Sequence, residues 1–152
     1  MRCMSTDNLA DKLAIRDVIE GFSDAVTHRA WEKLGAAFHE DATWKVGAPM
    51  KLTLQSRDGI VAGLSAGIGR MDFLAQMTQS MVISIDGDKA TSRTVIHEIG
   101  RTTSQKSGLC LIGSYNDILS RREGIWAFDS REFIVIYLDP AWIDGTVGSA
   151  FT

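Results

Sequence analysis

The side chains best suited to chemistry in this sequence lie in the strand-like stretches of its second half. Tyr115 and Asp117 share one strand face with Leu109, Leu111 and Gly113, because side chains two residues apart in a strand point the same way. A phenol and a carboxylate beside apolar residues could donate a proton to a substrate oxygen or accept one from it. The alternative is structural, with the Tyr115 hydroxyl bound to a backbone group and Asp117 capping the sheet edge.

A further candidate acid or base lies within residues 89–101, where Glu98 follows His97 and the two must point to opposite faces of a strand. Burial in a cavity would raise the pKa of Glu98 towards a range useful for general acid–base catalysis. His97 would be the natural base if the strand faced the other way. Ile96 lies on one face of the strand and Ile99 on the other, so the sequence does not determine which face points inward.

The composition indicates a single domain over residues 1–152. The chain has 152 residues, 45% of them hydrophobic, and a net charge of −3 without Lys/Arg clusters, which argues against nucleic-acid or anionic-membrane partners. No apolar run is long enough to cross a bilayer or to act as a secretion signal, and two distant cysteines suit a reducing compartment, so we expect a cytoplasmic protein. The three histidines do not cluster, and the glycine-rich run 63–69 lacks a preceding strand, so we expect no metal and no cofactor.

Helical spacing dominates the first part of the chain. Ser5, Thr6 and Asp7 offer N-cap side chains, and apolar residues then recur at steps of three and four up to Val26, with Phe22 near the centre of the stripe. A second helix is predicted from the helical spacing of Trp31, Leu34 and Phe38. The helix is expected to break at His39-Glu40-Asp41, and a short strand is predicted over residues 42–46. Residues 47–57 are predicted as loop, and Ile60, Val61 and Leu64 as a short third helix.

The remaining chain is predicted to form two hairpins. Residues 77–85 and 89–101 flank Asp86-Gly87-Asp88, and residues 109–120 and 125–138 flank Arg122-Glu123-Gly124. The connections are too short for parallel crossovers. Helices followed by a mainly antiparallel sheet define the α+β class.

The last predicted strand is apolar on both faces. Arg131, Phe133, Val135 and Tyr137 alternate with Ile134, Ile136 and Leu138. One face should pack on the helices, and the other needs its own cover, since large exposed apolar patches are uncommon on monomers. Either the tail containing Trp142, Ile143 and Phe151 supplies this cover, or a second subunit does. We favour a homo-oligomer, a dimer or a trimer.

The order of these segments resembles the SnoaL-like group of the nuclear transport factor 2-like superfamily. The resemblance is carried by FSDAVTHRAWEKL, AAFHEDATW, ISIDGDKA and GSYNDILSRREGIWAF, and it covers about residues 9–138, leaving 139–152 as a tail. It implies a cone-shaped, cystatin-like α+β barrel in which a curved antiparallel sheet wraps a long helix around an apolar pocket. The chain looks most like the branch of scytalone dehydratase and lindane dehydrochlorinase.

That branch uses an Asp at the end of the first helix and a His before the second strand, and the matching positions here are Thr27 and Gln76. A hydroxyl and an amide cannot act as a general base near neutral pH. The catalytic residues of the ketosteroid isomerase branch are also missing, because its tyrosine position corresponds to Phe22 and the position of its base lies near Val46.

Arg131 matches an arginine that faces the pocket in the dehydrochlorinase branch, where a guanidinium could stabilise a developing anion or a departing group. The alternative is a structural ion pair, for which Glu98 is the expected partner, because it matches a pocket-lining position of the same branch.

The resemblance implies a cofactor-independent lyase or isomerase acting on an apolar cyclic or aromatic compound. Catalytic candidates are Arg131, Tyr115, Glu98 and Asp117. Substrate-binding candidates are Phe22, Thr27, Trp44, Met71, Leu74, Gln76, Ile96, Leu111, Phe133 and Val135, although apolar residues among them would serve equally well as core. The alternative function is a non-catalytic ligand-binding or association module, resembling the small subunit of a ring-hydroxylating dioxygenase.

Overall fold

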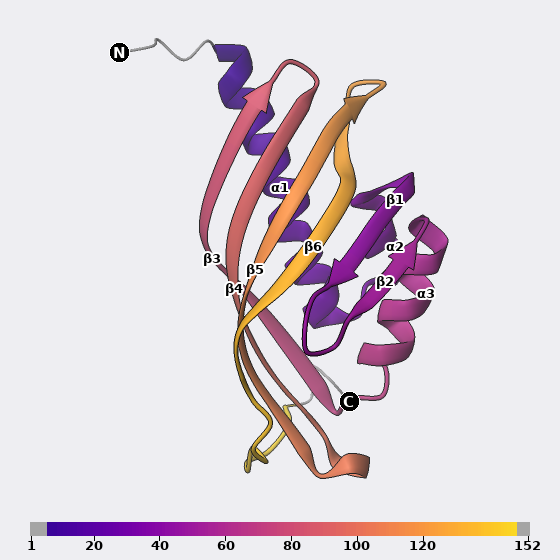
Figure 1. The fold of residues 1–152 in the computed structure, drawn as a ribbon, viewed down its shortest axis with the longest axis vertical. Helices are drawn as coiled ribbons and strands as arrows, with labels where there is room; N and C mark the ends of the chain where they lie inside the picture. Colours follow the sequence, from indigo (N-terminus) through magenta and orange to yellow (C-terminus); the bar gives the residue numbers. More distant parts are fainter. Residues whose placement is uncertain (1–5, 149–152) are drawn as a thin grey trace.

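The computed structural model describes residues 6–148 as helices lying against one face of a curved sheet (Figure 1). The helices are α1 (Thr6–His28), α2 (Trp31–Ala36) and α3 (Arg57–Ile68), with a short 3-10 turn, η1 (Thr103–Gln105). The strands are β1 (Phe38–Val46), β2 (Leu52–Gln55), β3 (Phe73–Asp86), β4 (Lys89–Thr102), β5 (Ser107–Arg122) and β6 (Ile125–Asp139). This order of elements confirms the α+β class.

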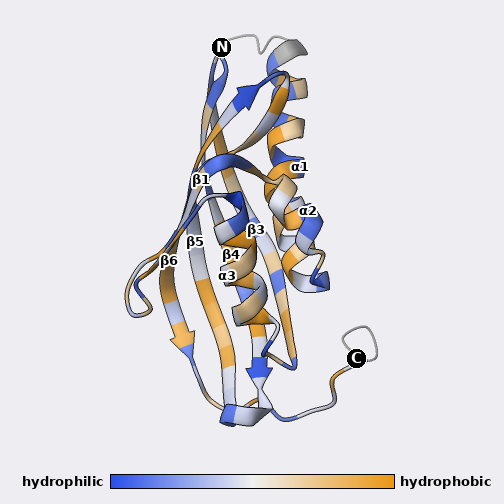
Figure 2. Ribbon diagram, turned by 90° about the vertical axis from the view of Figure 1, so that its right-hand side faces the viewer, coloured by the Kyte–Doolittle hydropathy of each residue, from blue (hydrophilic) through white to orange (hydrophobic). Residues whose placement is uncertain are grey.

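The six strands form one open sheet in the order β2-β1-β6-β5-β4-β3. All neighbours are antiparallel except β1 and β6, which pair in parallel and are joined by the whole of the intervening chain. Because β2 and β3 remain at the edges, the sheet curves around the helices without closing into a complete barrel. Figure 2, which views the molecule from the side, shows α1 and α2 on one side of the sheet and no helix on the other.

Both predicted hairpins are present, with strands that run further than expected. Gly87 adopts a φ of 58° in the turn between β3 and β4, and Glu123 and Gly124 adopt φ values of 53° and 81° between β5 and β6. Positive φ angles are what tight hairpin turns require, so local turn chemistry sets these two connections.

Helix α1 lies in the concave side of the sheet, where Phe22 contributes the central ring of the core. Its ring meets those of Phe38, Tyr115 and Phe128 edge-on, at centroid distances of 5.8, 5.7 and 6.3 Å. The apolar stripe of α1 therefore joins strands that are far apart in sequence.

Three local expectations differ from the structure. Phe38 begins β1 instead of extending the second helix, because its ring fills the core beside Phe22 and its backbone pairs with β6. The expected break at residues 39–41 lies inside the same strand. The segment predicted as loop contains β2, which pairs only with β1. Ser5 and Phe151, named above as a cap and a cover residue, lie outside the described residues.

The described part of the tail lies against the end of the sheet. The amide of Gly108 donates to Pro140 O at 3.1 Å, and Arg101 Nη1 donates to Ile143 O at 2.9 Å. Ile134 and Ile136 remain exposed, so this part of the tail does not cover the outer side of the sheet. Among the described helices, none is long and apolar enough to span a membrane.

Candidate functional site

A cavity of about 180 Å³ lies between α1, α3 and the concave side of the sheet. Most of its wall is apolar, with Phe22 from α1, Leu64 from α3 and Leu111 from β5 among the lining residues. The polar groups in the wall are Gln76 and Glu98, together with the hydroxyl of Tyr115 and the indole nitrogen of Trp44. The cavity thus combines an apolar body with a few polar groups, as small-molecule sites do.

Strand register decides which candidates face this cavity. Gln76 on β3 lies opposite Glu98 on β4, which lies opposite Leu111 on β5. Glu98 shares its face with the fully buried Ile96, so the pleat directs it inward and directs His97 to the outer side. The question that the sequence left open is therefore answered in favour of Glu98.

A directed chain of hydrogen bonds ends at this carboxyl group. Thr78 Oγ1 donates to Ser23 Oγ at 2.9 Å, and Ser23 Oγ donates to Gln76 Oε1 at 2.8 Å. Gln76 then has its Nε2 free to donate to Glu98 Oε1. The two hydroxyls orient the amide so that the Glu98 carboxyl meets a donor, and one of its oxygens is held in place.

Two opposing effects act on the protonation of Glu98. Burial raises the pKa of the Glu98 carboxyl above its ordinary value, because a charge is poorly solvated beside apolar walls, and the hydrogen bond from Gln76 acts in the opposite direction. Burial has the larger effect, so the pKa is raised. A carboxyl group with a raised pKa is a stronger base than an ordinary one and can also act as an acid nearer neutral pH.

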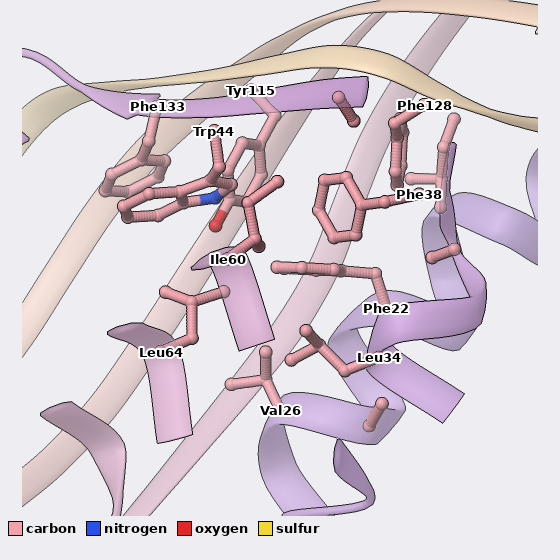
Figure 3. Packing of buried hydrophobic residues seen from close by; sticks show 14 of the residues in the cluster. Phe22, Val26, Leu34, Phe38, Trp44, Ile60, Leu64, Tyr115, Phe128 and Phe133 are labelled. Atoms are coloured by element: carbon pink, nitrogen blue, oxygen red, sulfur yellow. The ribbon is translucent and has the colours of Figure 1, made fainter. Parts of the chain in front are cut away.

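Tyr115 and Trp44 place two further polar groups beside Glu98. Burial raises the pKa of the Tyr115 phenol above its ordinary value, against opposing effects of Arg131, Gln76 and Trp44, so the phenol remains a proton donor. Trp44 Nε1 is buried, and no acceptor meets it with full hydrogen-bond geometry, although it approaches the Tyr115 hydroxyl closely enough to lower the pKa of the phenol. Figure 3 shows the indole nitrogen of Trp44 and the phenol oxygen of Tyr115 close together in the core. An unpaired buried N–H is costly, and a ligand acceptor could satisfy it.

Arg131 and Asp117 lie outside the cavity wall, in a closed cluster of their own. Arg131 Nε and Nη2 donate to the two carboxylate oxygens of Asp117 at 2.9 and 3.1 Å, and Ser92 Oγ donates to the same carboxylate at 2.9 Å. The guanidinium lies 4.4, 3.9 and 4.2 Å from the ring centroids of Phe22, Tyr115 and Phe128. The cation therefore lies behind the Tyr115 ring.

This cluster corrects two expectations. The ion-pair partner of Arg131 is Asp117 and not Glu98, because β5 and β6 place Arg131 directly opposite Asp117, whereas Glu98 lies opposite Gln76 and Leu111. Asp117 also does not cap a sheet edge, since β5 is an interior strand.

Several predicted lining residues do not reach the cavity. Thr27 Oγ1 instead accepts a hydrogen bond from the backbone amide of Gln76 at 2.9 Å, and so ties α1 to β3. Ile96, Met71 and Val135 pack in or against the core. Phe22, Trp44, Leu74, Gln76, Leu111 and Phe133 do line the cavity, as predicted.

Six further lining residues were not predicted: Val26, Val46, Met50, Leu64, Ile68 and Leu109. Their apolar character was visible in the sequence, but only packing separates a cavity wall from ordinary core. Among the described residues, no group of three or more His, Cys, Asp or Glu side chains could hold a metal ion.

The fold is of the nuclear transport factor 2-like type, with an apolar cavity between the helices and the sheet. The SnoaL-like domain family matches residues 7–132, which is most of the chain, and the protein belongs to this family. At the level of sequence, no curated protein matches the chain.

Solved structures share the fold at low sequence identity. A candidate scytalone dehydratase from Novosphingobium aromaticivorans superposes with a TM-score of 0.81 at 22% identity, over 93% of this chain and 94% of that one. A hexachlorocyclohexane dehydrochlorinase, LinA-type3 from Novosphingobium barchaimii, gives 0.82 at 20% identity, over 93% and 97%. A candidate aromatic ring hydroxylase from N. aromaticivorans gives 0.78 at 19% identity, over 92% and 96%.

Proposed function

We propose that this protein is a cofactor-independent lyase or isomerase that removes a proton from an apolar cyclic or aromatic compound, with Glu98 as the general base. The observation that carries the proposal is a carboxyl group with a raised pKa in an apolar cavity, beside the Tyr115 hydroxyl and the unpaired Trp44 N–H. Structural relatives that are named as a dehydratase candidate and a dehydrochlorinase support this reaction class.

In the proposed step, the Glu98 carboxylate takes a proton from a carbon of the bound ring. The electron pair of the broken C–H bond forms a carbon–carbon double bond, and the leaving group departs with its own bonding pair. Tyr115 and Trp44 would donate hydrogen bonds to the charge that develops on the substrate or on the leaving group. An isomerase would return the proton from Glu98 to a different carbon.

Arg131 then acts on the reaction indirectly. Its contact with the Tyr115 ring positions the phenol, and its positive charge opposes the effect of burial on the Tyr115 pKa. Asp117 holds the guanidinium in that place through two hydrogen bonds. Both candidates thus become positioning residues, whereas Glu98 and Tyr115 remain the candidates for direct contact with substrate.

The first experiment measures ligand binding. Steroids, polyketide-like aromatics, terpenoids and halogenated rings are screened by thermal shift, because a ligand that binds only the native state raises the melting temperature. Hits are then assayed for turnover with the wild type, Glu98→Gln and the control Glu32→Gln, an identical change at an exposed position of α2. Loss of turnover with retained binding in Glu98→Gln alone supports the proposal. Undiminished turnover in that variant contradicts it.

A second candidate function is a non-catalytic ligand-binding or association module, resembling the small subunit of a ring-hydroxylating dioxygenase. It is favoured by one observation: Thr27 and Gln76, which replace the acid and base of the related enzymes, are neutral, and the Thr27 hydroxyl bonds to the Gln76 backbone. Tight binding of a hit without conversion in the wild type would support this function over catalysis.

A cytoplasmic location and homo-oligomeric assembly as a dimer or trimer remain predictions. Light scattering coupled to gel filtration of the purified chain measures the second directly.

A further inference from the structure

The side-chain amide of Gln76 contacts both groups that the proposed reaction places against the substrate. An amide offers one oxygen that accepts hydrogen bonds and two N–H groups that donate them. The oxygen accepts from Ser23 Oγ at 2.8 Å, and Nε2 donates to Glu98 Oε1. Gln76 also approaches the Tyr115 hydroxyl closely enough to lower the pKa of the phenol. Because Gln76 is only 7% exposed, water has little access to this amide.

The orientation of the amide is set from outside the cavity. If the amide turned over, Gln76 Oε1 would face the Glu98 carboxylate, and two acceptors would meet without a hydrogen between them. Ser23 opposes this rotation, because its single hydroxyl hydrogen points to Gln76 Oε1. Thr78 Oγ1 donates to the Ser23 oxygen at 2.9 Å, which leaves the Ser23 hydrogen available for the amide. Residues of α1 and β3 thus decide which end of the amide meets Glu98.

No other polar group of the described structure competes for Glu98. Gln76 is its one hydrogen-bond donor there, and Tyr115 is the one other titratable group among the described residues that line the cavity. The lining residues from α1 and α3 are apolar, and the charge of Arg131 lies behind the Tyr115 ring, paired with Asp117. The donor from Gln76 is therefore the main effect that opposes burial and favours the carboxylate form of Glu98.

We propose that Gln76 is a positioning residue, held by Ser23 and Thr78, that keeps Glu98 as the acceptor of the cavity and Tyr115 as its donor. The inference rests on the proposed function, in which Glu98 takes a proton and Tyr115 donates a hydrogen bond. The amide N–H favours the form of Glu98 that can accept a proton. The phenol oxygen is approached by the N–H groups of Gln76 and Trp44, so the phenol hydrogen is left for a ligand. The cavity then suits a ring that offers an acceptor atom to Tyr115 and an acidic hydrogen to Glu98.

Titration of Glu98 in the ligand-free protein tests the inference directly. NMR of glutamate labelled at the carboxyl carbon follows this titration in the wild type and in Gln76→Met, Ser23→Ala and Thr78→Val. Gln76→Met keeps an unbranched side chain without a donor and should move the titration to higher pH, because the carboxylate loses its hydrogen bond. Ser23→Ala should give a smaller shift in the same direction, and Thr78→Val the smallest, since each leaves the amide in place but less firmly oriented.

A matched control separates this role from a structural one. Ser114→Ala also truncates a buried serine, but on the opposite side of β5 from Tyr115, and it should leave the Glu98 titration unchanged. In the Gln76→Met background, Ser23→Ala should add no further shift, because Ser23 acts through the amide. If Ser23 only ties α1 to β3, Ser23→Ala will leave the titration unchanged in the wild-type background as well, which would overturn its part in the proposal.

The effect on Tyr115 has its own signal. The chain has two tyrosines, so labelling the ring carbon that bears the hydroxyl gives two resonances. Gln76→Met should shift the Tyr115 resonance, whereas the resonance of Tyr137, which is 53% exposed on β6, should stay in place. An unchanged Tyr115 resonance would show that Gln76 does not hold the phenol.

Turnover of a screening hit adds the functional measurement. Gln76→Met should lower kcat about tenfold or more and change KM less, because the amide positions the reacting groups and is not proposed to hold the ligand. An unchanged Glu98 titration in Gln76→Met would overturn the inference even if the wild type is active. A wild type without turnover would contradict the proposed catalysis, yet the titration would still decide whether Gln76 sets the protonation of Glu98. Melting curves confirm folding, and Ser23→Ala and Thr78→Val carry the test if Gln76→Met does not fold.

Discussion

The buried ion pair between Arg131 and Asp117 offers the strongest test of how this core is held together. The change is Asp117→Asn, which keeps the shape of the side chain and its contact with Ser92 but removes the negative charge. The side chains of Arg131 and Asp117 are 1% and 0% exposed, so water cannot replace the lost partner. One nitrogen of Arg131, Nη1, already lacks a hydrogen-bond partner in the described structure.

The size of the effect follows from this burial. Removing one member of a buried pair usually costs about 3–5 kcal/mol, because the remaining charge stays buried without compensation. Three aromatic rings within 4.4 Å of the guanidinium still stabilise the cation, which places the expected loss near the lower end, at about 3 kcal/mol. For a chain of this size, that corresponds to a decrease in melting temperature of roughly 6–12 °C.

Urea unfolding, followed by circular dichroism, measures the loss as a change in midpoint at constant slope. Glu20→Gln is the control, because its pair with Arg16 is about half exposed and should change stability by less than about 0.5 kcal/mol. The double variant Asp117→Leu with Arg131→Met removes both charges and should be less destabilised than Asp117→Asn alone. A loss below about 1 kcal/mol in Asp117→Asn would refute the reasoning.

The other predictions concern the cavity. Burial raises the folded-state pKa of Glu98, so the folded protein binds the Glu98 proton more tightly than the unfolded chain does. The contribution of Glu98 to the free energy of unfolding is therefore greatest below the unfolded pKa of about 4.3 and decreases as pH rises towards the folded pKa. Glu98→Gln should therefore be more stable than the wild type at pH 7 and not at pH 3.5, as urea midpoints at the two pH values will show; equal differences at both would contradict this. In Gly113→Ala, the new Cβ would lie 2.1 Å from the Phe133 ring, so the free energy of unfolding measured in urea should fall by about 1–3 kcal/mol. The second change Phe133→Leu should restore part of this stability. An unchanged stability of Gly113→Ala would count against this packing. Trp44→Phe removes the unpaired indole N–H and should weaken a ligand that carries an acceptor about fivefold in calorimetry; equal affinity would mean that the N–H is not used.

Local patterns predicted most of the secondary structure. The Asp86-Gly87 turn and the Glu123-Gly124 turn are determined by residues that tolerate positive φ, and the long first helix by apolar residues at steps of three and four. β2 was missed because an edge strand of four residues has no period long enough to detect. Phe38 was misplaced because its spacing from Trp31 matches a helix equally well.

The candidate site was predictable only in part. Phe22, Trp44 and Tyr115 were expected at an apolar cavity and line one. Glu98 could not be oriented, because both faces of its strand mix apolar and polar residues. The hydrogen bonds from Ser23 to Gln76 and from Gln76 to Glu98 had no signal in the sequence, since they join residues 53 and 22 positions apart.

The sequence by itself determined the class of the fold, its hairpins and the set of residues able to do chemistry, because turn residues and hydrophobic periods act over a few neighbouring positions. Only the tertiary structure decided which carboxyl group pairs with Arg131 and which one lies at the cavity. The pairing of β5 with β6 puts Asp117 against Arg131 in a closed cluster, and the pairing of β3 with β4 puts Glu98 against Gln76 at the cavity. Both acids lie in similar strand sequences, and only strand register and packing separate the one that neutralises a buried cation from the one whose pKa is raised beside an apolar cavity.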